Sequence, residues 1–192
     1  MRSQMIRNAV ALAACMAIFP MAFGQNEPKP EQYSARWVVT GGAAGGANVQ
    51  IDIRINKYNT DADIKSYSDI LVAGGPDRLR QALEKEDVGQ LSPVGRVGTP
   101  LAIARKVVQG DKTIVHVLTA RNFSFGELRN SGRSVDYPYT ILELVLDKDG
   151  NGTGTAIAAA KIKFNKKNKT HEIESLGHGS SFNKLLNVRL EK

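Results

Sequence analysis

The segment Thr119–Tyr139 holds the densest group of side chains that could bind a ligand. It reads TARNFSFGELRNSGRSVDYPY, and its alternation of apolar and polar residues is weak. Guanidinium groups form paired hydrogen bonds with planar anionic groups, and aromatic rings offer faces for stacking. Loops held by a rigid sheet are where binding residues usually lie. We therefore expect the ligand-binding residues to be Arg121, Arg129, Arg133, Asp136, Tyr137 and Tyr139.

The same segment has a purely structural interpretation. A long loop must bury side chains in order to be ordered. Its aromatic residues would then plug one end of the domain, and Arg129 or Arg133 would pair with Asp136. Under this interpretation, the loop completes the fold and binds nothing.

Histidines are the next candidates for chemistry, and the chain has three of them, His116, His171 and His178. The sequence has no H-E-x-x-H motif, no paired histidines two residues apart and no G-x-S-x-G nucleophile motif. It therefore predicts no metal site and no cofactor. An enzymatic alternative remains, a hydrolase or isomerase using His116 or His178. A carboxylate such as Asp136 or Glu127 would be its partner.

Two short motifs resemble ion or nucleotide loops but lack a necessary part. Asp147–Gly152 matches the first half of a calcium loop, yet Ala158 stands where such a loop has its bidentate acid. Gly41–Gly46 lacks the spacing of a dinucleotide-binding turn and the lysine of a P-loop. Both motifs are interpreted as connections between strands.

A run of lysines marks the last third of the chain. Exposed lysines on a strand and its turn protect a sheet edge against pairing with other chains. The alternative is a contact with an anionic glycan, a lipid headgroup or a nucleic acid. The lysines are Lys161, Lys163, Lys166, Lys167 and Lys169.

The clearest strand is Val49–Asn56, where apolar and polar residues alternate without exception. This pattern is typical of an antiparallel strand with one buried face and one face in water. Ala35–Thr40 is expected to be its hairpin partner, with Trp37 in the core.

A pair of helices is expected next. Thr60 can cap the first helix, with Asp63 as its capping-box partner. Gly74 and Gly75 end that helix, and Pro76 opens the second at a position that tolerates its missing N–H. The pair would cover one end or face of the sheet.

From Val88 onward, the chain reads as short strands separated by turn signals. The predicted fold class is α+β and β-rich. It is a mostly antiparallel sheet of about eight strands or more, curled into a barrel or sandwich, with the helical pair inserted after the second strand. The candidate strands are Gly89–Val94, Leu101–Val108, Thr113–Thr119, Thr140–Leu146, Thr153–Phe164, Lys169–Glu174 and Phe182–Leu190.

Two hairpins allow a prediction of register. A four-residue loop at Asn165–Asn168 would place Lys161 opposite Glu172, with charges on one face and apolar groups on the other. An odd-length loop around Asp149 would set large residues against small ones, which is how tapered β cores are filled. The expected pairs are Leu142 with Ala158, Leu144 with Ala156 and Leu146 with Gly154.

The first 24 residues have the three parts of a secretory signal. Arg2 and Arg7 precede an unbroken apolar run at Ala9–Phe19, and small residues up to Gly24 suit signal peptidase. The run is too short to span a bilayer, which needs about 20 apolar residues. A lipobox-like sequence ends at Cys15, but an apolar stretch follows it, so cleavage near Gly24 is favoured over lipid anchoring.

The domain organisation follows from this leader. Residues 1–24 are expected to be a signal peptide, 25–32 a flexible lead-in and 33–192 a single β-rich domain, secreted or periplasmic. Loss of Arg2 and Arg7 lowers the formal net charge by two, from +7 to +5, which is no nucleic-acid footprint. Loss of Cys15 leaves no thiol and no disulfide.

Five parts of the chain are similar to segments of other proteins. These parts are Ile51–Tyr58, Leu83–Lys85 leading into Gly89–Gly98, Asn130–Pro138, Leu142–Ala160 and Leu186–Lys192. They resemble a family of uncharacterised secreted proteins of soil bacteria, acidobacteria in particular. The resemblance covers most of the chain after the leader and implies secretion and a single domain. It assigns no activity, ligand or catalytic residue.

The leading functional hypothesis is a non-enzymatic secreted or envelope protein that binds a small or anionic ligand. The ligand would lie at a barrel mouth or under Thr119–Tyr139. Expected partners are a small molecule or an anionic envelope component, with no nucleic acid and no stable membrane span. The alternatives are the histidine-dependent enzyme and a structural surface protein that has no ligand pocket.

Overall fold

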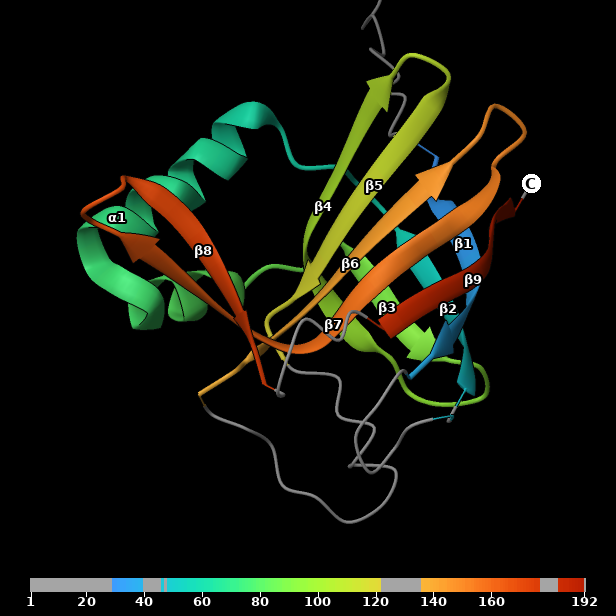
Figure 1. Ribbon diagram of the computed structural model, residues 1–192, viewed down its shortest axis with the longest axis horizontal. Helices are drawn as coiled ribbons and strands as arrows, with labels where there is room; N and C mark the ends of the chain where they lie inside the picture. Colours follow the sequence, from blue (N-terminus) through green and yellow to red (C-terminus); the bar gives the residue numbers. More distant parts are fainter. Residues whose placement is uncertain (1–28, 40–45, 47, 122–135, 177–182, 192) are drawn as a thin grey trace, which may run out of the picture.

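The chain folds into a strongly curved β-sheet with one helix beside it (Figure 1). The computed structural model describes residues 29–39, 46, 48–121, 136–176 and 183–191. In chain order, the elements of this part are β1 (Glu31–Val38), β2 (Asn48–Ile55), α1 (Asp61–Leu83), β3 (Gly89–Pro93), β4 (Thr99–Gln109), β5 (Lys112–Thr119), β6 (Tyr139–Leu146), β7 (Asn151–Asn165), β8 (Thr170–Ser175) and β9 (Asn183–Glu191).

Eight of these strands close into an antiparallel barrel. They hydrogen-bond in the order β6-β5-β4-β3-β2-β1-β9-β7, and a further ladder between β6 and β7 completes the ring. The long strand β7 pairs with β6 and β9 in its first part and with β8 in its last part. The predicted β-rich antiparallel fold is confirmed, and of the two predicted arrangements the structure is the barrel.

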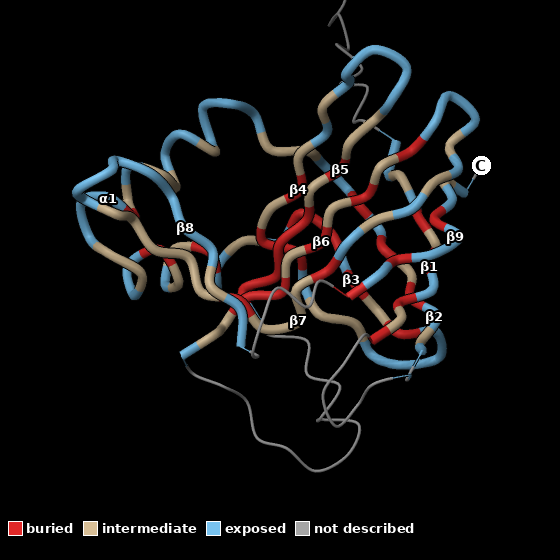
Figure 2. Tube along the Cα trace, in the orientation of Figure 1, coloured by how far each residue is buried: buried red, intermediate tan, exposed pale blue. Residues whose placement is uncertain are grey.

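The barrel interior is packed with apolar side chains because successive residues of each strand point alternately inward and outward. The alternating isoleucines of β2 are buried there, and so is Trp37, as predicted. Figure 2 shows buried positions along the strands of the barrel. Small residues of β7 face leucines of β6, which confirms the large-against-small arrangement. The observed pairs are Leu142 with Ala156, Leu144 with Gly154 and Leu146 with Gly152.

The predicted register of this hairpin is wrong by two residues, because the turn is tighter than expected. Asp147 Oδ1 accepts the backbone N–H groups of Asp149 and Asn151, at 2.9 Å each. Gly150 takes the left-handed conformation (φ 80°), and β7 begins directly after it. The glycine opposite Leu144 is required, since a Cβ at Gly154 would lie 2.2 Å from a carbonyl oxygen of β6.

The register predicted between β7 and β8 is also wrong by two residues. Lys161 pairs with Glu174 instead of Glu172. Asn165 remains in the strand, and its side chain accepts N–H groups from the turn that follows, including that of Lys167 at 3.0 Å. The turn therefore starts one residue later than predicted. A shift of two keeps every side chain on its predicted face.

The predicted pair of helices is not confirmed, because the described residues form one helix, α1, which is interrupted at Gly75. Gly75 has φ 75° and ψ −176°, and the helix resumes at Pro76. Proline is tolerated at the start of a helical stretch, where its missing N–H would have no partner. The predicted cap is confirmed, since Thr60 and Asp63 form a reciprocal capping box.

Helix α1 lies outside the barrel and forms a second apolar cluster with it. We call the last part of β7 together with β8 the arm; it lies over α1 in Figure 1. Ser68 of α1 and His171 of the arm are in hydrogen-bond contact, at 2.9 Å. The buried members of the cluster are Leu71, Leu79, Leu83, Ala102, Leu118, Ala120, Tyr139 and Ala160.

The expected signal peptide and Cys15 lie outside the described residues. Strand β1 begins at Glu31, so it includes the last two residues of the expected lead-in. None of the described helical residues forms a segment apolar and long enough to cross a membrane.

Candidate functional site

One end of the barrel carries polar side chains at inward-facing positions. We call this end the mouth; it is where β1 begins, where the β4–β5 and β6–β7 hairpins turn and where β9 ends (Figure 1). Ala104 is buried in the core, so Lys106, two residues on, points inward too. By the same alternation, Glu31 continues the inward face of Tyr33. The residues above the packed core therefore line an opening.

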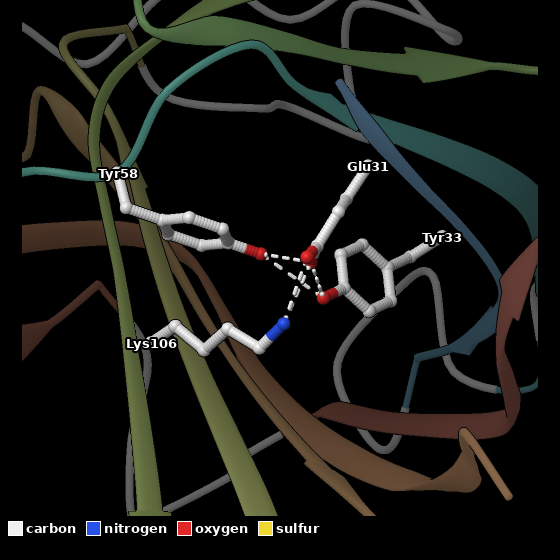
Figure 3. A network of polar contacts seen from close by, with 4 residues as sticks. All are labelled: Glu31, Tyr33, Tyr58 and Lys106. Atoms are coloured by element: carbon white, nitrogen blue, oxygen red, sulfur yellow. Dashed lines mark hydrogen bonds and ion pairs between the residues drawn. The ribbon is translucent and has the colours of Figure 1, made fainter. Parts of the chain in front are cut away.

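The carboxylate of Glu31 is the centre of a hydrogen-bond network at the mouth (Figure 3). Tyr33 donates its hydroxyl to Glu31 Oε2 at 2.5 Å, and Tyr58 donates to the same oxygen at 2.6 Å. The ammonium of Lys106 lies 2.8 Å from Glu31 Oε1 and 3.1 Å from Oε2. One acceptor therefore holds three donors that come from three separate elements.

The backbone fixes the position of Tyr58 in this network. Tyr58 lies between β2 and α1, in a connection that is hydrogen-bonded to β4 through the next residue, Asn59. The N–H of Asn59 donates to the carbonyl of Ala104 at 2.7 Å, and the Asn59 side chain accepts the Ala104 N–H at 2.8 Å. The tyrosine is therefore held against the strand that carries Lys106.

Folding moves the pKa values of three groups of the network, Glu31, Tyr33 and Tyr58, away from neutrality. Burial acts to raise the pKa of Glu31, but hydrogen bonds from Lys106, Tyr33 and Tyr58 outweigh it, so that the pKa is lowered. Burial and the hydrogen bond to Glu31 raise the pKa of Tyr33 and of Tyr58. A general acid or base works best with a pKa near the working pH. At neutral pH, Glu31 therefore stays charged, and the two tyrosines stay protonated as hydrogen-bond donors.

A cavity of about 250 Å³ opens beside this network. The carbonyl of Gly150 accepts the N–H of Leu190 at 2.8 Å, so the β6–β7 turn is fastened to β9. The lining therefore comes from barrel strands and from a turn that is fastened to one of them. Its members are Tyr33, Lys106, Thr113, Leu146, Asp147, Lys148, Asp149, Gly150 and Leu190.

The described members of the predicted binding segment lie where β5 ends and β6 begins, at the end of the barrel opposite the mouth. Arg121 lines a second cavity, of about 240 Å³, together with the acids Glu84 and Glu86. Asp136 is exposed and Tyr137 half-buried, at the other end of the barrel from the mouth. Tyr139 is buried in the cluster under α1. The remaining two, Arg129 and Arg133, lie outside the described residues.

The histidines of the enzymatic alternative do not meet the predicted carboxylates in the described residues. His116 Nε2 lies 2.9 Å from Glu143 Oε2, and each side chain is 45% exposed on the outer wall of the barrel. Neither residue lines a cavity described above. His178 and Glu127 lie outside the described residues.

The lysine run is partly engaged in the arm. Lys163 pairs with Glu174 at 2.7 Å, and both side chains are about 40% exposed. Lys166, Lys167 and Lys169 belong to the exposed turn between β7 and β8. This distribution agrees with the protection of a sheet edge by charge.

The sequence reasoning missed the residues of the mouth. Glu31 was assigned to a flexible lead-in because prolines precede it, and Tyr58 fell between a strand and a helix. A signal existed for one of them. Lys106 interrupts the predicted strand Leu101–Val108 at a position with the inward parity of Ala104, and a charge on an inward face points to the rim of a barrel.

No protein-family model matches the chain, and no curated protein or solved structure does so. The resemblance to secreted proteins of soil bacteria therefore stays a hypothesis. Fold and site have to carry the functional argument by their geometry.

Proposed function

We propose that this is a non-enzymatic binding protein that holds a small polar molecule in the cavity at the barrel mouth. The observation that carries the proposal is Lys106, an inward-facing ammonium held by Glu31 beside a cavity of about 250 Å³. Pockets for drug-sized ligands start at roughly 300 Å³. The ligand is therefore expected to be smaller than those molecules.

Preorganisation supports binding at this site. Lys106 and Glu31 are only about one-third exposed, and the tyrosines fix the carboxylate from the other side. A ligand that reaches Lys106 finds its ammonium already oriented, so little side-chain entropy is lost on binding. A closed barrel provides the rigid support that such a site needs.

The protonation states favour binding over catalysis. The pKa values of Glu31, Tyr33 and Tyr58 are moved away from neutrality, whereas a hydrolase or isomerase needs a group that exchanges a proton near the working pH. The contact between His116 and Glu143 is exposed to solvent, so it offers little shielding for a reaction.

We propose that the protein acts after export, in the periplasm or outside the cell, where the leader would deliver it.

A survey of small molecules by thermal unfolding tests the proposal. A ligand that binds only the folded state stabilises it by RT ln(1 + [L]/Kd), about 2.7 kcal/mol at one hundred times Kd. We expect at least one class among amino acids, sugars and small carboxylates to raise the Tm of the protein. The Lys106→Met variant should lose this ligand-induced shift.

The matched control is Lys112→Met. Lys112 lies at the same rim, one residue before the inward-facing Thr113, so its side chain points outward. This variant removes the same charge from the same end of the barrel and should keep the shift. Equal loss in both variants, or no shift with any compound, would contradict binding at the mouth.

A further inference from the structure

The charges around the mouth cavity point to the class of ligand. We propose that the ligand is a small zwitterion the size of one neutral α-amino acid, with its carboxylate at Lys106 and its ammonium at Asp149. This inference rests on the proposed function and deepens it.

The lining of the cavity carries charges of both signs. It contains two cations, Lys106 and Lys148, and two anions, Asp147 and Asp149. Each lysine is also paired with a carboxylate outside the lining, Lys106 with Glu31 and Lys148 with Asp111. A purely anionic ligand would be repelled by the aspartates, whereas an ammonium group would be attracted to them. A molecule that carries both charges can place each of them against its opposite, which is the electrostatic complementarity on which specificity depends.

These charged groups differ in the hydrogen bonds that they have left to make. An ammonium has three N–H donors, and the two oxygens of Glu31 take two of the donors of Lys106. One oxygen of Asp147 is already bonded to the backbone of its turn, whereas the carboxylate of Asp149 has no hydrogen-bond partner in the described part of the chain. Lys148 is paired with Asp111, and its side chain is 73% exposed. Lys106 is therefore the less exposed cation with an N–H left to donate, and Asp149 is the anion with both oxygens available.

The size and polarity of the cavity limit the ligand further. A cavity of about 250 Å³ leaves room for a single amino acid and not for a peptide. Leu146 and Leu190 add apolar surface to the lining, and Thr113 adds a hydroxyl. A short, uncharged side chain suits this mixture better than a sugar, which would meet two leucines with hydroxyl groups.

Isothermal titration calorimetry of the purified protein tests the inference with matched probes. The neutral α-amino acids are titrated first. The tightest of them is then compared with its analogue lacking the amino group and with its analogue lacking the carboxylate. We expect each analogue to bind roughly 10- to 100-fold more weakly, since it loses hydrogen bonds between charged groups. Glucose serves as the neutral polyol.

Two variants assign each charge to its partner. Asp149→Asn should weaken the amino acid roughly tenfold or more and leave the affinity for the analogue without the amino group unchanged. Lys106→Met should weaken both of these ligands. If Lys106→Met does not fold, Lys106→Gln keeps a polar donor beside Glu31 without the positive charge and should weaken both ligands in the same way.

The outcomes separate the two proposals. If an analogue, glucose or a different compound from the thermal survey binds as tightly as any amino acid, the zwitterion is wrong, while loss of that binding in Lys106→Met keeps the mouth as the site. If neither these probes nor the survey yields a ligand, both proposals fail.

Discussion

Tyrosines in two regions of the molecule have opposite surroundings. At the mouth, the hydroxyls of Tyr33 and Tyr58 both donate to Glu31. Under α1, the hydroxyl of Tyr139 is buried and has no hydrogen-bond partner in the part of the chain that the structure describes. Burial, with no bonded partner, raises the pKa of Tyr139 to about 12. The same side chain is thus part of a polar network in one region and a packing residue in the other.

This difference indicates where the fold specifies polar geometry. A buried polar group without a partner costs about 1–3 kcal/mol, so such groups are rare unless something else is gained. The ring of Tyr139 fills space among the leucines of α1, and its hydroxyl contributes nothing to that. At the mouth, Tyr33, Tyr58 and Lys106 all donate to one carboxylate. Chemistry is therefore expected at the mouth, and the cluster under α1 is expected to hold the helix and the arm on the barrel.

The strongest test of this comparison removes the acceptor at the mouth. Glu31→Ala should lower the free energy of unfolding by about 2–3 kcal/mol, because it leaves Lys106 and both tyrosines without their acceptor. Urea denaturation measures this loss. The matched control is Glu191→Ala, which removes an exposed glutamate that contacts only Ser34 in the described residues and should cost less than about 0.5 kcal/mol. Equal losses would mean that the network at the mouth is an ordinary surface feature.

Acidification should reproduce part of that loss. The pKa of Glu31 is lowered by folding from its ordinary value of 4.5, so in acid the unfolded chain takes up a proton that the folded chain does not. The stabilisation by the Glu31 charge is therefore complete above pH 4.5 and is lost as the pH falls through the lower folded value. Urea midpoints of the wild type and of Glu31→Gln, measured from pH 7 to pH 3, should converge. A gap that stays constant would show that the charge of Glu31 does not stabilise the fold.

The sequence predicted the architecture better than the site, for a physical reason. Alternation over Val49–Asn56 and the sizes along β6 and β7 report burial, and burial is what closes the barrel. The sequence predicts the end of a helix at Gly75, where the structure has a kink. A glycine in the left-handed conformation can stand at either position, so the sequence does not show whether the helix resumes. Both registers failed at turns set by a side chain, Asp147 in one and Asn165 in the other.

The mouth depends on contacts that no local pattern contains. Glu31 and Lys106 are 75 residues apart in sequence, and Tyr58 joins them from a third element. Each residue alone is compatible with an exposed surface. Only closure of the barrel brings them to one point, so spacing along the chain could not predict the network.

A smaller effect compares the tyrosines directly, through removal of one oxygen atom. Tyr33→Phe should destabilise the protein by about 1 kcal/mol, because it removes a hydrogen bond to a carboxylate. Tyr139→Phe should instead stabilise it by about 1 kcal/mol, because it removes a buried hydroxyl that has no partner in the described residues. Thermal and urea unfolding of the two variants measure the signs. Destabilisation by Tyr139→Phe would break the comparison.

The smallest expected effect tests whether the exposed fraction of two charged side chains, and not the distance between them, determines how much their contact stabilises the fold. The ion pair between Lys106 and Glu31 and the contact between His116 and Glu143 have nearly equal lengths, 2.8 and 2.9 Å. The side chains of the second contact are 45% exposed, so His116→Ala should change the free energy of unfolding by less than about 0.5 kcal/mol at pH 7. A loss as large as that of Glu31→Ala would mean that the barrel wall holds a second specified polar contact. Chemistry would then be expected at His116 as well as at the mouth.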